Sequence, residues 1–232
     1  MKFDISPWPS FTLMLACATG SSPPAAREAP VGASSLRAPE PLPASEGALA
    51  GMFAPDAARE VVAFWRQAGP SLWFAKDPEF DRRFRERFGS LYAAAAAGQL
   101  LDWTATPEGA LGLILLLDQY PRNSFRGSAR MYATDALARQ RADAAIRAGH
   151  DRRVPPELAL FIYLPFGHSE ALSDQERCVE LARRIGPPHV GHAEHHRDIV
   201  RRFGRFPHRN AILGRVSTPD EQRYLEQGGY QG

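Results

Sequence analysis

From residue 55 onward, the hydrophobic positions follow the repeat of an α-helix. Phe80, Phe84, Phe88 and Leu91 recur at intervals of four, four and three residues, which places them on one helix face. Residues 110–117 are apolar nearly all round, so this helix is expected to be central and buried. No segment alternates polar and apolar residues as a half-buried strand would. The pattern predicts an all-α fold.

Three of the predicted helices begin with the same start signal. Each has a side chain that can cap the helix, then a proline whose missing N–H is not needed there, then an acid favoured by the helix dipole. These starts are Asp77-Pro78-Glu79, Thr106-Pro107-Glu108 and Thr218-Pro219-Asp220-Glu221. Thr218 and Glu221 also have the spacing of a capping box.

Further helices are predicted over residues 128–148, from Pro155 or Pro156 to near Pro165, over 173–185 and over 192–203. Glycines follow three of them, at Gly149, Gly186 and Gly204. Because the connections are short, consecutive helices should run antiparallel. We therefore expect an antiparallel helical-hairpin array or bundle.

Residues 1–52 have a different composition. After Gly20 this part consists mainly of Pro, Ala, Ser and Gly, which cannot bury enough apolar surface to offset the entropy of ordering. We expect a disordered leader or tether over residues 1–52 and one helical domain over residues 53–232.

The leader contains the tetrapeptide Met-Leu-Ala-Cys, which ends at Cys17 and resembles a bacterial lipobox. Two interpretations stay open: a lipid anchor at Cys17, or a misassigned start codon that adds residues without function. A cytoplasmic protein is expected, with a membrane-anchored lipoprotein as the alternative. No apolar run reaches the ~18–20 residues that a spanning helix needs, so no transmembrane segment is expected.

Composition narrows the function classes only slightly. The 232 residues are 44% hydrophobic and carry a formal net charge of +2, so no nucleic-acid partner is expected. Lysine occurs only at Lys2 and Lys76, and such an arginine bias means that arginines must be judged by position. His192 and His196 have metal-capable spacing, but their order is not that of the His-Glu-x-x-His motif of metalloproteases. No metal or cofactor is expected.

The first polar segment, residues 118–127, directly follows the most buried helix. Arg122 and Arg126 could present their guanidinium groups to an anion, with Asp118 and Asn123 beside them. Alternatively the segment is structural: Asp118 pairs with an arginine and Asn123 caps the next helix.

The second polar segment contains His168, Ser169 and Glu170 in succession. Adjacent residues do not face one another, so these three alone cannot form a catalytic triad. His168 could act as a general acid or base and Glu170 could orient another residue's ring. Alternatively Ser169 caps the following helix and His168 is an ordinary loop histidine.

The third polar segment, residues 203–210, repeats the order of the first: an aromatic residue, proline, then arginine and asparagine after a helix. It provides Arg205, His208, Arg209 and Asn210, with His196 upstream. The first and third polar segments could face each other across a cleft that holds a ligand with a carboxylate or phosphate group. The alternative is a solvated basic helix end.

The three segments together resemble the signature blocks of a bacterial family catalogued as domain of unknown function 924. The matching stretches are residues 113–126, 165–175 and 202–215, and the resemblance covers about residues 59–226. His196 matches the histidine that precedes the last block of the family pattern. The resemblance implies an all-α fold similar to tetratricopeptide-like helical arrays and implies no known reaction.

Two function hypotheses follow. In the first, the polar segments converge on a pocket that binds or acts on a small anionic ligand, with His168, His196 or His208 as the acid or base. In the second, the chain is a protein- or peptide-binding helical scaffold whose polar loops are structural. The sequence does not decide whether the protein is an enzyme. The first hypothesis requires the segments to gather round one hollow.

Overall fold

The computed structural model describes residues 55–232, and all regular secondary structure in this range is helical. The predicted all-α fold is confirmed. The predicted leader over residues 1–52, with its lipobox at Cys17, lies outside the described residues. Within residues 55–232 no helix is both long enough and apolar enough to span a bilayer.

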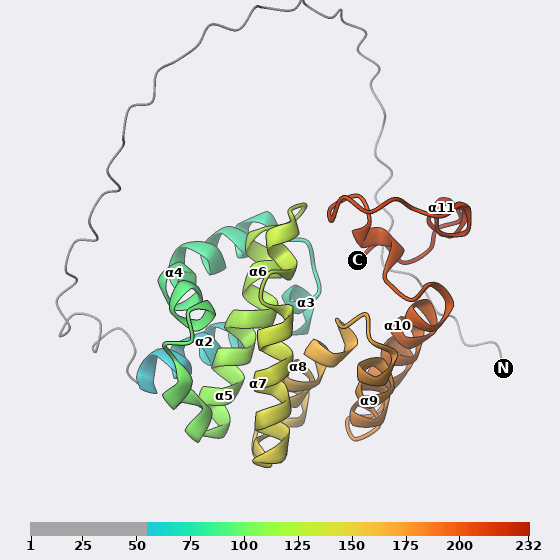
Figure 1. Cartoon of the computed structure of the whole chain (residues 1–232). Helices are drawn as coiled ribbons and strands as arrows, with labels where there is room; N and C mark the ends of the chain where they lie inside the picture. The colour runs from blue at the N-terminus through green and yellow to red at the C-terminus, as the bar shows by residue number, and fades with distance from the viewer. Residues whose placement is uncertain (1–54) are drawn as a thin grey trace, which may run out of the picture. The chain divides into compact units, whose positions relative to one another are not determined.

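Helices α7 to α10 pack in the order in which they follow one another along the chain, whereas α2, α4, α5 and α6 pack out of sequence order (Figure 1). Helix α5 packs against α2 and α7, α8 lies between α7 and α9, and α10 packs along α9. The α-helices are α2 (Pro55–Ala68), α3 (Pro70–Trp73), α4 (Pro78–Ala96), α5 (Pro107–Ile114), α6 (Tyr120–Ser124), α7 (Asp135–Arg147), α8 (Pro156–Gly167), α9 (Leu172–Ala182), α10 (His189–Phe203) and α11 (Pro219–Glu226). Short 3-10 turns are η1 (Leu101–Ala105), η3 (Ala129–Tyr132), η4 (His150–Arg152) and η5 (Pro207–Arg209), and η2 (Leu115–Gln119) is π-helical.

The three predicted helix starts are confirmed. The Asp77 side chain accepts a hydrogen bond from the Phe80 N–H at 2.7 Å, and the Thr106 hydroxyl accepts one from the Gly109 N–H at 3.1 Å. Thr218 and Glu221 form the complete capping box at the start of α11. These starts were predictable because a cap depends only on residues within one helical turn.

Other helix boundaries differ from the prediction. The helix expected over 128–148 begins at Asp135, because Ser128 caps the separate 3-10 turn η3 before it. Helix α8 continues through Pro165 to Gly167. Helices α9 and α10 are displaced by one to three residues at their ends, within or near the usual uncertainty of such boundaries.

An aromatic stack forms one side of the core. Phe84 of α4 is fully buried, and its ring centroid lies 5.4 Å from Phe64, 5.5 Å from Trp65 and 5.4 Å from Tyr120. These contacts join α2, α4 and α6. Beside the stack, α5 and η2 are buried on every side, as their continuous apolar sequence predicts.

The first polar segment, predicted as a loop, is instead helical. The Tyr120 N–H donates to the Leu115 carbonyl five residues back, which makes residues 115–119 a π-turn, and α6 continues from there. Pro121 has no N–H and cannot bond the carbonyl of Leu117, but the Thr134 hydroxyl donates to this oxygen instead. A partner from the start of α7 thus allows the helix to pass a proline, and this leaves Asp118 on a buried π-turn.

We expect Phe84→Ala to lower the free energy of unfolding by about 3–5 kcal/mol, because it removes a fully buried ring that touches five other rings. Urea denaturation measures the change. Leu101→Ala is the control, since Leu101 is 47% exposed and should change the free energy by no more than about 0.5 kcal/mol. Equal effects of the two substitutions would contradict this view of the core.

Candidate functional site

Asp118 and His168, from the first and second polar segments, are in direct contact. His168 Nδ1 lies 2.8 Å from Asp118 Oδ1, although the residues are 50 positions apart. The Asp118 side chain has no exposed surface, and that of His168 is 16% exposed. Because an ionised carboxylate can only accept hydrogen bonds, the proton of a neutral His168 ring is on Nδ1, and Nε2 keeps its lone pair.

Arg122 is shared between two carboxylates. Its two Nη atoms donate to the two oxygens of Asp135 at 2.8 and 3.0 Å, and Nη1 also lies 3.1 Å from Asp118 Oδ1. The same nitrogen donates to the Asp118 carbonyl at 2.8 Å. Asp135 is the first residue of α7, so this ion pair joins the first polar segment to the start of α7.

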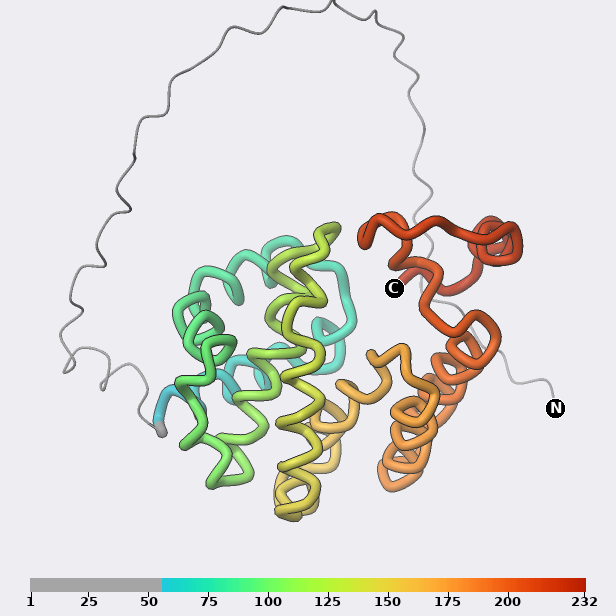
Figure 2. The backbone as a smooth tube through the Cα atoms, in the orientation of Figure 1, coloured from blue at the N-terminus to red at the C-terminus, as the bar shows by residue number. Residues whose placement is uncertain are grey.

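Arg209, from the third polar segment, completes the contact among the three segments. Its Nη2 donates to the His168 carbonyl at 3.0 Å, and Nη1 lies 3.8 Å from Asp135. The guanidinium lies between the rings of Tyr132 and Phe206, at 4.5 and 4.6 Å from their centroids. In Figure 2 the chain after α10 can be followed as it reaches back toward the start of α7. We call Asp118, Arg122, Asp135, His168 and Arg209 the polar cluster.

Burial and charge shift the pKa values of the polar cluster. Burial and the nearby Arg122 lower the pKa of His168, although Asp118 acts in the opposite direction. For Asp118, burial would raise the pKa, but Arg122 and His168 outweigh it and hold the pKa well below its usual range. Burial and Arg122 also lower the pKa of Arg209. The cluster therefore holds an ionised carboxylate, a neutral imidazole and a guanidinium in an unfavourable field.

Four ring side chains lie next to the polar cluster, and we call them the aromatic wall: His196, Phe206, His208 and Tyr230. The Tyr230 centroid lies 4.8 Å from His196 and 5.0 Å from His208, and the His196 ring lies 5.6 Å from Phe206. Burial first, and neighbouring positive or histidine groups next, lower the pKa of His196 and of His208 to about 3. Both rings are therefore neutral at physiological pH.

Several predicted site residues are occupied by internal partners. Glu170 accepts two hydrogen bonds from Arg215, at 2.7 and 3.0 Å, and one from the Phe206 N–H at 2.8 Å. Arg126 donates to both oxygens of Asp81 and to Asn123. These contacts join separate segments and leave little hydrogen-bonding capacity for a ligand.

Arg205 and Asn210 hold α11 against the third segment. Arg205 donates to both oxygens of the buried Glu221, at 2.6 and 2.8 Å. The Asn210 amide donates to the Ser217 hydroxyl at 3.0 Å and, more weakly, to Glu221 at 3.3 Å. The third segment thus has an inner face, with His208 and Arg209, and an outer face that anchors a helix.

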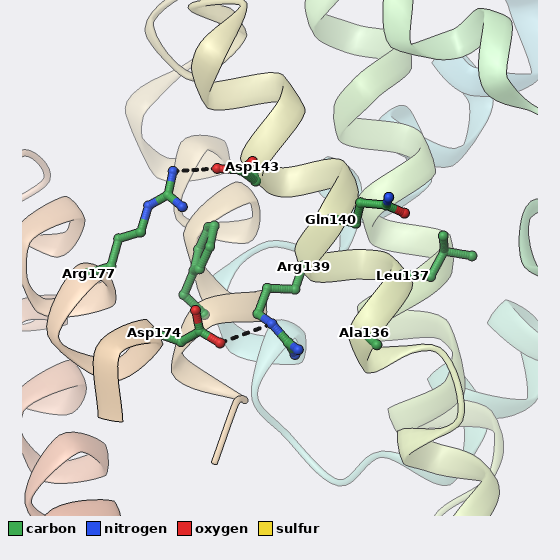
Figure 3. A pocket seen from close by; sticks show the side chains of 8 residues that line it. Ala136, Leu137, Arg139, Gln140, Asp143, Asp174 and Arg177 are labelled. Carbon is green, nitrogen blue, oxygen red and sulfur yellow. Dashed lines mark ion pairs between the residues drawn. The ribbon is translucent and has the colours of Figure 1, made fainter. Parts of the chain in front are cut away.

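Two hollows are found on the described surface, and no residue of the polar cluster lines either of them. The larger is an open groove of about 670 Å³ between α7 and α9, flanked by ion pairs of Arg139 with Asp174 and of Arg177 with Asp143 (Figure 3). The smaller, of about 350 Å³, lies at the outer face, where Arg205 and Glu221 line it. Residues of the three polar segments are in contact with one another. Neither hollow, however, is the shared ligand-binding hollow around which these segments were expected to gather.

Three residues of this region were missed in the sequence. Asp135 and Tyr132 lie just before or at the start of α7, and Tyr230 lies after the last helix. The many arginines imply acidic ion-pair partners. The chain has 26 acidic residues, however, and distance along the sequence does not indicate which of them pairs with which arginine. Within residues 55–232 no three His, Cys, Asp or Glu side chains gather as a metal site would require.

The fold and the site define a class of all-helical protein in which a buried carboxylate–histidine pair joins distant segments. Residues 61–229 match a bacterial protein family of unknown function (DUF924), and the chain belongs to this family. A solved structure of a protein of unknown function from Agrobacterium tumefaciens is similar, with 53% sequence identity and a TM-score of 0.74. The match covers 75% of this chain and 98% of that one. The comparison with curated proteins finds no match.

The neutral buried histidines should make stability depend on pH. Because the pKa values of His196 and His208 are lower in the folded state than in the unfolded chain, the unfolded chain binds more protons below about pH 6.5. We expect the free energy of unfolding to fall between pH 6.5 and 5, with each histidine adding a slope that approaches about 1.4 kcal/mol per pH unit.

Urea denaturation at pH 8, 7, 6 and 5 measures this slope. His196→Phe should reduce it, since the ring can no longer gain a proton in the unfolded chain. The carboxylates with lowered pKa values, such as Glu221, lose their stabilising effect only below about pH 4.5 and leave this window unaffected. A free energy that stays constant from pH 7 to 5 would show that the histidines are not held neutral.

Proposed function

We propose that the polar cluster binds a small anionic molecule and that His168 exchanges a proton with it. The observation that carries the proposal is the contact of His168 Nδ1 with the fully buried Asp118, next to Arg122 and Arg209.

The environment of His168 favours a role as a base. The carboxylate of Asp118 fixes the tautomer and the ring orientation, and Gln119 in turn donates to the other oxygen of Asp118 at 2.7 Å. The lowered pKa of His168 keeps the ring unprotonated near neutral pH, so that Nε2 can accept a proton.

The charges of the polar cluster favour an anion as the ligand. Asp135 is already paired with both Nη atoms of Arg122, and its Oδ2 lies 3.8 Å from Arg209 Nη1. Asp135 therefore compensates the positive charge of Arg209 only in part. Arg209 Nε is buried and has no hydrogen-bond partner among the described residues. A buried guanidinium with incomplete pairing is destabilising, and a nearby anion would relieve this. Arg126, Arg205 and Asn210, which have internal partners, hold the surrounding scaffold in this proposal.

The groove between α7 and α9 favours a second candidate function, the binding of a peptide by a tetratricopeptide-like helical array. The groove is open, and Phe166 is one of the side chains that line it. Its four charged side chains are already paired with one another, however, so little charge is free to recognise a partner. We therefore rank this function second.

A thermal-shift panel of phosphate, sulfate, citrate and nucleotide anions tests the first function. An anion that binds the folded state must raise the melting temperature. Arg209→Gln should weaken its binding by about 10- to 100-fold, the range expected for loss of a charged hydrogen bond. Arg201→Gln is the matched control, because Arg201 lies exposed on α10. If no anion of the panel binds the wild-type chain, or if the two variants bind equally, the proposed function is wrong.

His168→Gln tests the acid–base role separately. It keeps a side chain of similar length that can hydrogen-bond Asp118, but it has no titratable nitrogen. Anion binding to the wild-type chain should change with pH as His168 titrates, and the dependence should vanish in this variant. His189→Gln, at the start of α10, serves as the control. The same pH dependence in His168→Gln would exclude His168 as the proton acceptor.

A further inference from the structure

The residues after α11 are built to turn back on the protein. Gly228 has φ +82°, in the region that favours glycine. At Gly229 a Cβ atom would lie 2.5 Å from the Tyr224 carbonyl oxygen, so no larger residue fits. The consecutive glycines therefore reverse the chain, and in Figure 1 its end lies beside the last helices, near α10.

The reversal delivers Tyr230 to the aromatic wall. Its backbone N–H donates to the Tyr224 hydroxyl at 2.9 Å. Its ring lies 4.8 Å from His196, 5.0 Å from His208, 5.9 Å from His195 and 6.4 Å from Phe206. Of these partners, His208 and Phe206 belong to the third polar segment, which also holds Arg209.

The phenol of Tyr230 also lies within electrostatic reach of the polar cluster. Burial raises the pKa of Tyr230, while Arg209 and Arg122 act to lower it. The backbone N–H of Tyr230 is held by Tyr224, while its side chain is only partly buried. The ring thus packs against the histidines without being fully enclosed.

We propose that Tyr230 occupies, within its own chain, a subsite for an aromatic ring, and that the ligand of the polar cluster is therefore an aromatic anion such as an aryl phosphate or aryl carboxylate. The inference rests on the proposed function. The ring of the ligand replaces the Tyr230 ring against His196, Phe206 and His208, and its anionic group meets Arg209. Residues 228–232 must then move aside for the ligand to enter.

The geometry explains why such a displacement is feasible. Residues 228–232 are held to the preceding helix by the backbone N–H groups of Gly228, Gly229 and Tyr230 and by one hydrogen bond of the Gln231 amide to the Leu225 carbonyl at 3.2 Å. Ring contacts of Tyr230 hold the segment to the aromatic wall. No ion pair ties this segment to the rest of the described chain. Each aromatic contact contributes only about 0.5–1.5 kcal/mol, so a free aromatic ring can compete with Tyr230.

Two variants that open the subsite test the proposal. One variant ends the chain after Gln227. The other is Gly229→Ala, whose added Cβ collides with Tyr224 and dislodges residues 228–232 while His196, Phe206 and His208 stay unchanged. Gly191→Ala is the matched control, because a Cβ there meets no atom within 4 Å. The probes are phenyl phosphate, inorganic phosphate and the uncharged p-cresol, studied by calorimetry and by NMR of the histidine rings.

Phenyl phosphate should bind both opened variants about tenfold more tightly than the wild-type chain or Gly191→Ala, because it no longer displaces a ring. p-Cresol should shift the ring resonances of His196 and His208 in the opened variants, and the peptide Gly-Gly-Tyr-Gln-Gly should reverse this shift. Inorganic phosphate should bind all four proteins alike, since it does not use the ring subsite.

The outcomes separate the two proposals. If p-cresol binds the opened variants but neither phosphate binds any protein, the aromatic subsite stands and the anion function is wrong. If inorganic phosphate binds while phenyl phosphate gains nothing from opening and p-cresol leaves the histidines unchanged, the aromatic subsite is wrong. Should the shortened chain fail to fold, Gly229→Ala alone decides between these results.

Discussion

The carboxylate of Asp118 has no contact with solvent, and the arrangement of the three polar segments follows from keeping it ionised. A buried carboxylate is strongly destabilising unless positive or hydrogen-bonding groups surround it. Arg122 and His168 provide these groups from two segments, and Arg209 binds the His168 carbonyl from the third. Because each partner comes from a different helix end, the neutralisation of one charge also fixes how α6, α8 and η5 meet.

The local parts of this structure were predictable, while the parts that depend on distant partners were not. The caps at Asp77, Thr106 and Thr218 act within one turn, so their sequence signals were sufficient. The polar segment 118–127 was expected to form a loop. The helix nevertheless continues, because the Thr134 hydroxyl bonds the Leu117 carbonyl from 17 residues away. No property of residues 118–127 alone indicates such a partner.

The site shows the same division. The sequence predicted that the segments with Arg122 and Arg209 lie close to His168. In the structure Arg209 contacts both the His168 carbonyl and Asp135, the ion-pair partner of Arg122. It did not identify which arginines are free to bind a ligand. Asp135, Asp81 and Glu221 neutralise Arg122, Arg126 and Arg205 from 13, 45 and 16 residues away, whereas Arg209 has only the 3.8 Å contact with Asp135. Ion-pair partners of this kind are set by tertiary packing.

The dominance of arginine over lysine has a consequence for proton movement. A guanidinium does not release its proton in proteins, so Arg122 and Arg209 keep their charge at any physiological pH. His196 and His208 are held unprotonated by burial, and burial likewise keeps the phenols of Tyr132 and Tyr230 protonated. Of His168, His196 and His208, only His168 has a hydrogen-bonded carboxylate that acts to raise its pKa, so its Nε2 is the atom of these three rings best placed to take up a proton. The charges of Arg122 and Arg209 around this atom do not change.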